Sequence, residues 1–285
     1  MKTLKYKFEA AAVSLLFAAF RLMPLDAASW LGGFMARSIG PFLRANKIAK
    51  NNLAMIYPNM TFTEQHALLM GMWDNLGRVA AELPWLATDR LFERITVTGM
   101  EYLPPAGKPV LFFSGHIGNW ELTYPVPYKA GIPTTLVYRE ANNPYVDTII
   151  SRIRAIHSTQ MVPKGKRGSV KILRAIKDGH ALAMLVDQKM NEGIAVPFFG
   201  RNAMTAPAIA ELALRYDMPL IPARVFRTKG CHFEGRAYPP LVVAKTGDNA
   251  KDILAIMTQI NAQLEAWIRE CPEQWFWVHK RWPNA

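Results

Sequence analysis

From about residue 94 onward, short apolar runs alternate with segments of helical pattern, and this alternation constrains the fold more than any other feature. Strands that alternate with helices form a mostly parallel sheet whose two faces are covered by helices. The sequence therefore predicts an α/β fold. The strand-like runs are 95–99, 109–115, 134–139, 181–187 and 219–226, and the helix-like segments between them are 119–130, 143–157, 168–178 and 205–217.

Helical regions are expected on both sides of these strands. Residues 46–90 have helical periodicity, with Thr61 or Thr63 as an N-cap and Glu64 in the first turn of the second helix. A later, more alternating strand is expected over 231–243, followed by a long amphipathic helix from Asp248 or Asn249. We predict a helical segment over 1–45 and a single α/β domain over 46–285, with 46–93 as its helical lead-in.

The amino-terminal segment is basic and then apolar. Lys2, Lys5 and Lys7 precede an uncharged run, Ala10 to Phe20, which is shorter than the roughly 20 residues that span a bilayer. The apolar character resumes after Arg21. A cleaved signal peptide and a soluble helical hairpin are alternative interpretations. We expect a membrane-associating segment that lies in the cytoplasmic leaflet and does not cross it.

The charge balance of the chain predicts an anionic partner. There are 34 basic and 22 acidic residues, a net charge of +12, which favours nucleic acid, an anionic membrane surface or a phosphorylated substrate. Nucleic acid fits poorly, because the main basic stretch, 139–177, has little aromatic interleaving and no known nucleic-acid motif. Its arginines suit phosphate, although a solvated helix face is the plainer explanation. Its basic residues are Arg139, Arg152, Arg154, Lys164, Lys166, Arg167, Lys171, Arg174 and Lys177.

Cysteine and histidine spacing predicts no metal site. Cys231 and Cys271 lie far apart and form no metal-ligand pattern, and the six histidines include no HExxH. A reduced, cytosol-facing protein follows as the simpler interpretation.

The segment VLFFSGHIGNWEL, 110–122, predicts a general base. A buried strand would deliver His116 to its carboxyl end, where open α/β sheets bind ligands, and Glu121 follows five residues later. Five residues of regular helix turn about 500°, so the two side chains meet only if His116 precedes the helix. Glu121 in the first turn would then orient the imidazole. A buried histidine satisfied by backbone, with Glu121 as a helix-dipole partner, is the alternative.

Other polar residues are expected near the same sheet edge. Asp187 and Gln188 end a second apolar strand, where they would orient a substrate or simply form a turn. Ser114 lacks a GxSxG elbow, which favours a packing role. Backbone N–H groups between Gly115 and Gly118 are a hypothetical oxyanion hole.

Residues 196–207 allow two further interpretations. Phe198 and Phe199 would line an apolar groove or belong to the core, and Thr205 with Pro207 is typical of a helix start.

Six segments, in this order, resemble the bacterial lipid A biosynthesis acyltransferases, the late lauroyl and myristoyl transferases. The phosphatidylinositol mannoside acyltransferases share that family. The segments are WDNLGRVAAEL (73–83), SGHIGNWE (114–121), YREANNPYVD (138–147), DQK (187–189), VPFFGR (196–201) and PEQWFWVHKRW (272–282). The resemblance covers most of the chain and implies a glycerolipid-acyltransferase-like α/β fold.

The resemblance also implies roles for single residues. His116 matches the family's general base and Glu121 its acidic partner. Arg139 and Arg154 match arginines of the site, with Arg152 as an alternative to Arg154. Lys164 and Arg167 would join them in binding phosphate, and Asp187 and Gln188 match a DQ pair. Many members continue that pair with an acidic residue where this chain has Lys189, which leaves the acyl chain and the acceptor open.

The implied reaction is acyl transfer at the cytoplasmic face of a bacterial inner membrane. The donor would be an acyl thioester on acyl carrier protein, or on coenzyme A. The acceptor would be a hydroxyl of a phosphorylated glycolipid, a lipid A precursor. The transfer would be direct, without an acyl-enzyme, a metal or another cofactor. Another glycolipid or phospholipid acceptor, a lipid hydrolase or thioesterase, and a non-catalytic lipid-binding protein are the alternatives.

Overall fold

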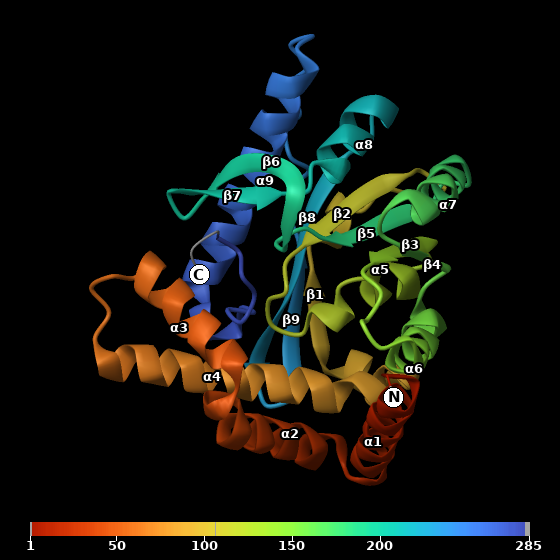
Figure 1. Cartoon of the computed structure of the whole chain (residues 1–285). Coiled ribbons are helices and arrows are strands. Elements are labelled where there is room, and N and C mark those ends of the chain that lie inside the picture. The colour runs from red at the N-terminus through yellow and green to blue at the C-terminus, as the bar shows by residue number, and fades with distance from the viewer. Residues whose placement is uncertain (1, 106, 283–285) are drawn as a thin grey trace.

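A seven-stranded sheet in the order β1-β9-β8-β2-β5-β3-β4 forms the centre of the molecule (Figure 1). This computed structural model describes residues 2–105 and 107–282, without the side chains of Lys2, Lys166 and Arg167. All neighbouring strands are parallel except β8 and β9, which confirms the predicted α/β class. The strands are β1 Ile95–Thr98, β2 Val110–Ser114, β3 Thr134–Tyr138, β4 Gln160–Pro163, β5 Ala181–Leu185, β8 Leu220–Lys229 and β9 His232–Ala237.

Strand β2 is buried along its whole length, because helices and loops cover both of its faces. Leu111 and Phe113 point into the core beneath helix α9 (Asn249–Glu270), where the ring of Phe113 stacks on Trp267 at 6.2 Å. Val110 and Phe112 belong to a separate cluster on the opposite face. The apolar run before His116 is therefore a central strand, as in most parallel sheets.

The helices after β2 largely follow the predicted segments. The exception is the expected helix over 119–130, which is divided into a short 3₁₀ turn, Trp120–Leu122, and helix α5, Pro125–Lys129. Pro125 and Pro127 explain the division, since proline has no N–H to donate to a preceding helical turn. The others are α6 Pro144–Arg154, α7 Lys166–Lys177 and α8 Ala208–Tyr216.

An antiparallel hairpin, β6 (Lys189–Phe198) with β7 (Arg201–Thr205), was not predicted. Phe199 and Gly200 both have positive φ, 53° and 70°, which is the geometry of a tight hairpin turn. Thr205 therefore ends a strand, and the expectation that it caps a helix is wrong: Pro207 is the N-cap of α8. Of the two interpretations of Phe198 and Phe199, the core is correct, since both rings are buried.

Four helices precede the sheet: α1 Lys2–Leu22, α2 Leu25–Ile39, α3 Arg44–Ile56 and α4 Phe62–Glu82. Thr61 and Glu64 form a reciprocal capping box at the start of α4, which confirms the predicted helix start. Helix α2 lies along α4 at very close range, because a Cβ atom on Gly32 would stand 2.5 Å from the carbonyl oxygen of Gly77. Figure 1 shows α1 standing beside α6 at the same end of the molecule. Within 2–105 and 107–282, every helix is too short or too polar to pass through a bilayer.

Candidate active site

His116 lies in the loop that leaves β2, before the 3₁₀ turn whose N-cap is Asn119. The expectation that the histidine precedes the helix is confirmed. The loop depends on Gly118, which has φ 57° and whose added Cβ would stand only 2.0 Å from the carbonyl oxygen of Val225. Only glycine fits there, because the chain crosses the neighbouring strand β8 at backbone contact distance.

The carboxylate that binds the His116 side chain is Asp187. Its Oδ1 lies 2.7 Å from His116 Nδ1, and its Oδ2 accepts the backbone N–H of His116 at 2.7 Å. The indole N–H of Trp275 donates to the same Oδ2 at 2.9 Å. The two residues meet because β2 and β5 are neighbours with Ser114 opposite Leu185, which places both strand ends at one edge. Sequence analysis placed Asp187 at that edge but did not pair it with His116.

Asp187 is 3% exposed, yet it remains ionised. Burial by itself raises the pKa of this carboxyl group, but the charge and hydrogen bonds of His116 and the Trp275 indole outweigh burial, and its pKa lies well below the usual range. An ionised carboxylate on Nδ1 fixes the imidazole tautomer that carries its proton on Nδ1. It also stabilises the imidazolium that forms when Nε2 takes a proton.

Glu121 does not contact His116, so the expected His116–Glu121 pair is wrong. Glu121 instead accepts two bonds from Arg154, from Nε at 2.8 Å and from Nη2 at 2.5 Å, and one from Trp120 Nε1 at 3.1 Å. Asn119 accepts the backbone N–H of Glu121, and the short 3₁₀ turn that follows directs its side chain toward α6. Of the two candidate arginines, Arg154 lines the cavity beside His116, and Arg152 is not among its lining residues.

The pairing removes Arg154 as a free phosphate ligand. Burial opposes the charge of its guanidinium, but the charge of Glu121 and its hydrogen bonds outweigh that effect, and the pKa of Arg154 is raised. Arg154 and Glu121 therefore form a largely neutral wall of the site.

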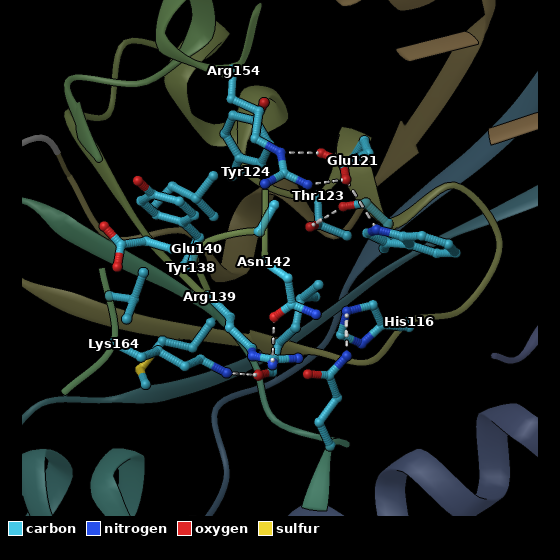
Figure 2. Close-up of a pocket in the computed structure, with 18 residues that line it drawn as sticks. His116, Glu121, Thr123, Tyr124, Tyr138, Arg139, Glu140, Asn142, Arg154 and Lys164 are labelled. Atoms are coloured by element: carbon cyan, nitrogen blue, oxygen red, sulfur yellow. Dashed lines mark hydrogen bonds and ion pairs between the residues drawn. The ribbon is translucent and has the colours of Figure 1, made fainter. Parts of the chain in front are cut away.

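A cavity of about 300 Å³ opens beside His116, and Figure 2 shows the side chains around it. His116, Glu121, Arg139, Arg154, Lys164 and Gln188 all line it. Gln188 Nε2 lies 3.3 Å from His116 Nε2, so the amide donates to the imidazole nitrogen that faces the cavity. Arg139 Nη2 contacts Asn142 Oδ1 at 3.4 Å, and Lys164 Nζ donates to the Leu185 carbonyl at 3.2 Å. Of the predicted binding residues, only Arg167 has its side chain outside the described part, although its backbone lies in the first turn of α7.

The hypothesis of a backbone oxyanion hole after Gly115 is wrong for three N–H groups. Those of His116, Ile117 and Gly118 donate to Asp187, to the Gly115 carbonyl and to the Gln274 carbonyl, respectively. Ser114 is buried in the strand and does not line the cavity, which supports the packing role.

A second cavity, of about 490 Å³, adjoins the first and is mainly apolar. It lies between α7, α8 and the ends of β5 and β6, with Ile172, Leu173, Ile209 and Leu212 among its apolar residues. The two cavities share five residues: Val137, Lys164, Met184, Leu185 and Gln188. A polar cavity at the imidazole and an apolar cavity are thus direct neighbours.

Comparisons with known proteins agree with this arrangement. The family model described as "Bacterial lipid A biosynthesis acyltransferase" matches residues 2–284. The chain belongs to this family. It is 26% identical to the lipid A biosynthesis lauroyltransferase of Escherichia coli (strain K12), over 84% of this chain and 79% of that protein. It is 24% identical to the lipid A biosynthesis palmitoleoyltransferase of the same organism, over 91% and 86%. This family member is accordingly an O-acyltransferase.

The aromatic segment near the carboxyl end of this acyltransferase, residues 271–282, supports the His116 loop and Asp187. Besides Trp275 on Asp187, the backbone N–H of Phe276 donates to the His116 carbonyl, and Ile117 pairs with Trp275 in an isolated bridge. In the sequence, residues 272–282 were recognised only as a family segment, with no role for Trp275. The family resemblance was the only signal available, because residue 275 is distant from residue 116 in the chain.

His279 of the acyltransferase is held neutral. Its Nε2 accepts the backbone N–H of Lys189 at 2.9 Å, which ties the segment after Asp187 to the aromatic segment. Burial is the main reason why the pKa of His279 falls to about 4; Asp187 opposes the fall, while His116 and two arginines add to it.

Because His279 is neutral in the folded protein, we expect the free energy of unfolding to fall at acidic pH. The unfolded chain takes up a proton near pH 6.5 but the folded chain only near pH 4, so stability is lost as pH falls through that window. We expect His279 to account for about 1–3 kcal/mol of the fall in unfolding free energy between pH 7 and 4. Urea unfolding of the wild type and of His279→Gln at several pH values measures this contribution. The glutamine keeps an acceptor for the backbone N–H of Lys189. Equal pH slopes in the two proteins would contradict the assignment.

Proposed function

We propose that this acyltransferase moves a fatty acyl chain from an acyl thioester to a hydroxyl of a phosphorylated glycolipid, a lipid A precursor. One observation carries the proposal: the His116–Asp187 pair faces a cavity with basic side chains, which adjoins an apolar cavity. The names of the curated relatives, a lauroyltransferase and a palmitoleoyltransferase of lipid A biosynthesis, support the acceptor.

In the proposed reaction, the acceptor hydroxyl replaces the Gln188 amide at His116 Nε2. The imidazole removes the hydroxyl proton as the oxygen attacks the thioester carbonyl carbon. The C–O ester bond forms, the C–S bond breaks, and the thiolate takes the proton back from the imidazolium. Asp187 stabilises that imidazolium throughout. The Gln188 amide, displaced from the imidazole, is the side-chain donor that we assign to the oxyanion, and the step calls for no acyl-enzyme, metal or cofactor.

In this proposal, the basic residues of the cavity bind the acceptor's phosphate, and those on α7 bind the acyl carrier protein. Arg139 and Lys164 line the cavity without an acidic partner among the ion pairs of 2–105 and 107–282, so they are the candidates for the acceptor's phosphate. Exposed Lys171, Arg174 and Lys177 lie on α7, the helix that covers the apolar cavity. They would meet an acidic acyl carrier protein as it delivers its thioester.

The proposal is tested by supplying purified protein with an acyl thioester on acyl carrier protein, with and without a phosphorylated lipid A precursor. We expect ester formation on the glycolipid and slow release of free fatty acid when the acceptor is omitted. Rapid acceptor-independent release would instead identify a thioesterase. Transfer to simple phospholipids at equal rates would reject the glycolipid acceptor. His116→Ala is expected to remove transfer in every arm.

The apolar cavity is proposed to hold the acyl chain, and Leu212→Trp tests this. A larger side chain in the cavity is expected to move the ratio of kcat/KM for lauroyl over palmitoleoyl donors upward by about tenfold or more, since each methylene contributes about 1–3 kcal/mol of discrimination. Leu254→Trp, on the exposed face of α9, is the matched control. An unchanged ratio in the Leu212 variant would place the chain elsewhere.

The amino-terminal helices are proposed to lie on an anionic membrane. Helix α1 exposes Leu4, Phe8, Leu15 and Leu22 along one stripe, and α2 exposes Trp30 and Phe34, whose rings stack at 5.5 Å. Exposed apolar and aromatic side chains beside basic ones are typical of helices that lie in the lipid interface. Asn143 at the cap of α6 donates to the carbonyl of Tyr6, so α1 packs beside the segment whose Asn142 lines the cavity.

Vesicle binding tests the membrane proposal. Trp30→Glu/Phe34→Glu is expected to weaken binding to vesicles of phosphatidylglycerol and phosphatidylcholine at least tenfold in a sedimentation assay, because each glutamate adds charge where apolar surface must insert. Val242→Glu alters a residue that is 81% exposed outside these helices and is the control. Equal binding by both variants would reject α2 as part of the membrane surface.

A further inference from the structure

Helix α4 holds the His116 loop from beneath through two buried side chains, neither of which lines the cavity. The first is Asn75, which is 6% exposed. Its Nδ2 donates to the Gly118 carbonyl at 2.9 Å, and its Oδ1 accepts Arg227 Nε from β8 at 3.0 Å. Asn75 thus fixes a backbone group two residues beyond the histidine.

The second is Glu82, which is fully buried and faces the same arginine. Arg227 donates from Nη1 to Oε1 at 2.6 Å and from Nη2 to Oε2 at 2.9 Å. Glu82 Oε2 also accepts the amide of Asn119 at 2.8 Å. Asn119 in turn accepts the backbone N–H of Glu121 at 3.2 Å. The Glu82–Arg227 ion pair is thus connected through Asn119 to Glu121, which binds Arg154.

We propose that Asn75, Glu82 and Arg227 are positioning residues for the transfer reaction: together they set the loop so that His116 and Glu121 face the cavity at the same time. The inference rests on the proposed function. One arm of the network, Asn75 to Gly118, sets the backbone on the histidine side. The other arm, Glu82 through Asn119, sets the Glu121 side.

Two physical arguments favour a positioning role over a contribution to stability alone. A buried ion pair is seldom more stabilising than well-packed apolar side chains, because both charges lose their hydration, so its value lies in directed bonds. The loop, in contrast, needs direction: its Gly118 adopts a left-handed conformation that packing alone does not dictate. A displacement of about 1 Å in a reacting group is enough to lower a rate by about 10²-fold.

Asn75→Ala tests the first arm, with Asn46→Ala as a matched control. Asn46 is also a buried asparagine with one bond to a backbone carbonyl, that of Pro41, and one to a side chain, Trp73, but it lies away from the loop. We expect both variants to lose similar melting temperature. Below both melting temperatures, Asn75→Ala should lower kcat by about 10²-fold with KM for the acceptor changed less than threefold, and Asn46→Ala should lower kcat less than twofold.

Asn119→Ala tests the second arm and covers the case in which Asn75→Ala does not fold. It removes the amide that joins Glu82 to the Glu121 backbone, and we expect the same selective loss of kcat. Equal kcat losses in the Asn46 control, or folded Asn75 and Asn119 variants with kcat within twofold of wild type, would overturn the inference. If His116→Ala also retains transfer, the proposed function itself fails; if only His116→Ala is inactive, the inference alone fails.

Discussion

Asp187→Asn is expected to lower kcat for acyl transfer by about 10³–10⁴-fold while KM for donor and acceptor changes less than threefold. The asparagine amide would donate to His116 Nδ1, where the carboxylate accepts. The imidazole would then carry its proton on Nε2 and could not accept one from the hydroxyl; the same change in a serine-protease triad has an effect of this size. Steady-state kinetics with each substrate varied separately measures it.

Asp147→Asn is the control for this substitution. Asp147 accepts the backbone N–H of Ala141 at the start of α6 but has no bond to His116. We expect its kcat to stay within threefold of wild type. If Asp187→Asn kept more than a tenth of the wild-type kcat, Asp187 would not be the partner on which the base depends.

Glu121→Gln is expected to lower the free energy of unfolding by about 3 kcal/mol. The substitution leaves the guanidinium of Arg154 largely buried without an opposite charge, and breaking one side of a buried pair costs about 3–5 kcal/mol. Because Arg154 retains some exposure, the lower end applies. Urea unfolding at pH 7 measures the change. The effect on kcat should be smaller than that of Asp187→Asn.

The double variant Glu121→Gln/Arg154→Met tests whether the stability loss comes from leaving Arg154 without an opposite charge. Methionine fills similar space without a charge, so we expect the double variant to recover most of the lost stability. A Glu121→Gln variant of wild-type stability with the kcat of Asp187→Asn would instead mean that Glu121 acts directly on His116, contrary to its contacts in the structure.

The sequence predicted the central strands β2, β3 and β5 well, because each is an apolar run followed by a helical segment. It missed the short strand β4, Gln160–Pro163, which has no apolar run of strand length. It also located His116, since the spacing argument excluded a histidine on the helix. The predicted partner of that histidine, Glu121, was wrong. Glu121 is near in sequence, but the direction of its side chain depends on Asn119 and on the short turn, which periodicity does not encode. Asp187 is 71 residues away and meets His116 only through strand register.

The residues that sequence analysis missed share a physical cause. Asn75, Glu82 and Arg227 have polar side chains at buried positions, and an amphipathic pattern alone predicts polar residues on the surface. Trp275 was quoted only within a family segment, because nothing in its neighbourhood indicates that its indole N–H meets a carboxylate. Such contacts join segments that no local signal connects.

The aromatic segment, residues 271–282, is among the last parts of the chain to be synthesised. Residues 271–282 follow every strand of the sheet in sequence, whereas α1 and α2 precede all of them. Because synthesis proceeds from the amino terminus, α1 and α2 are made before Trp275, the indole donor of Asp187. If α1 and α2 lie on the membrane as proposed, the growing chain can meet the lipid surface while the hydrogen bonds around His116 and Asp187 are still incomplete.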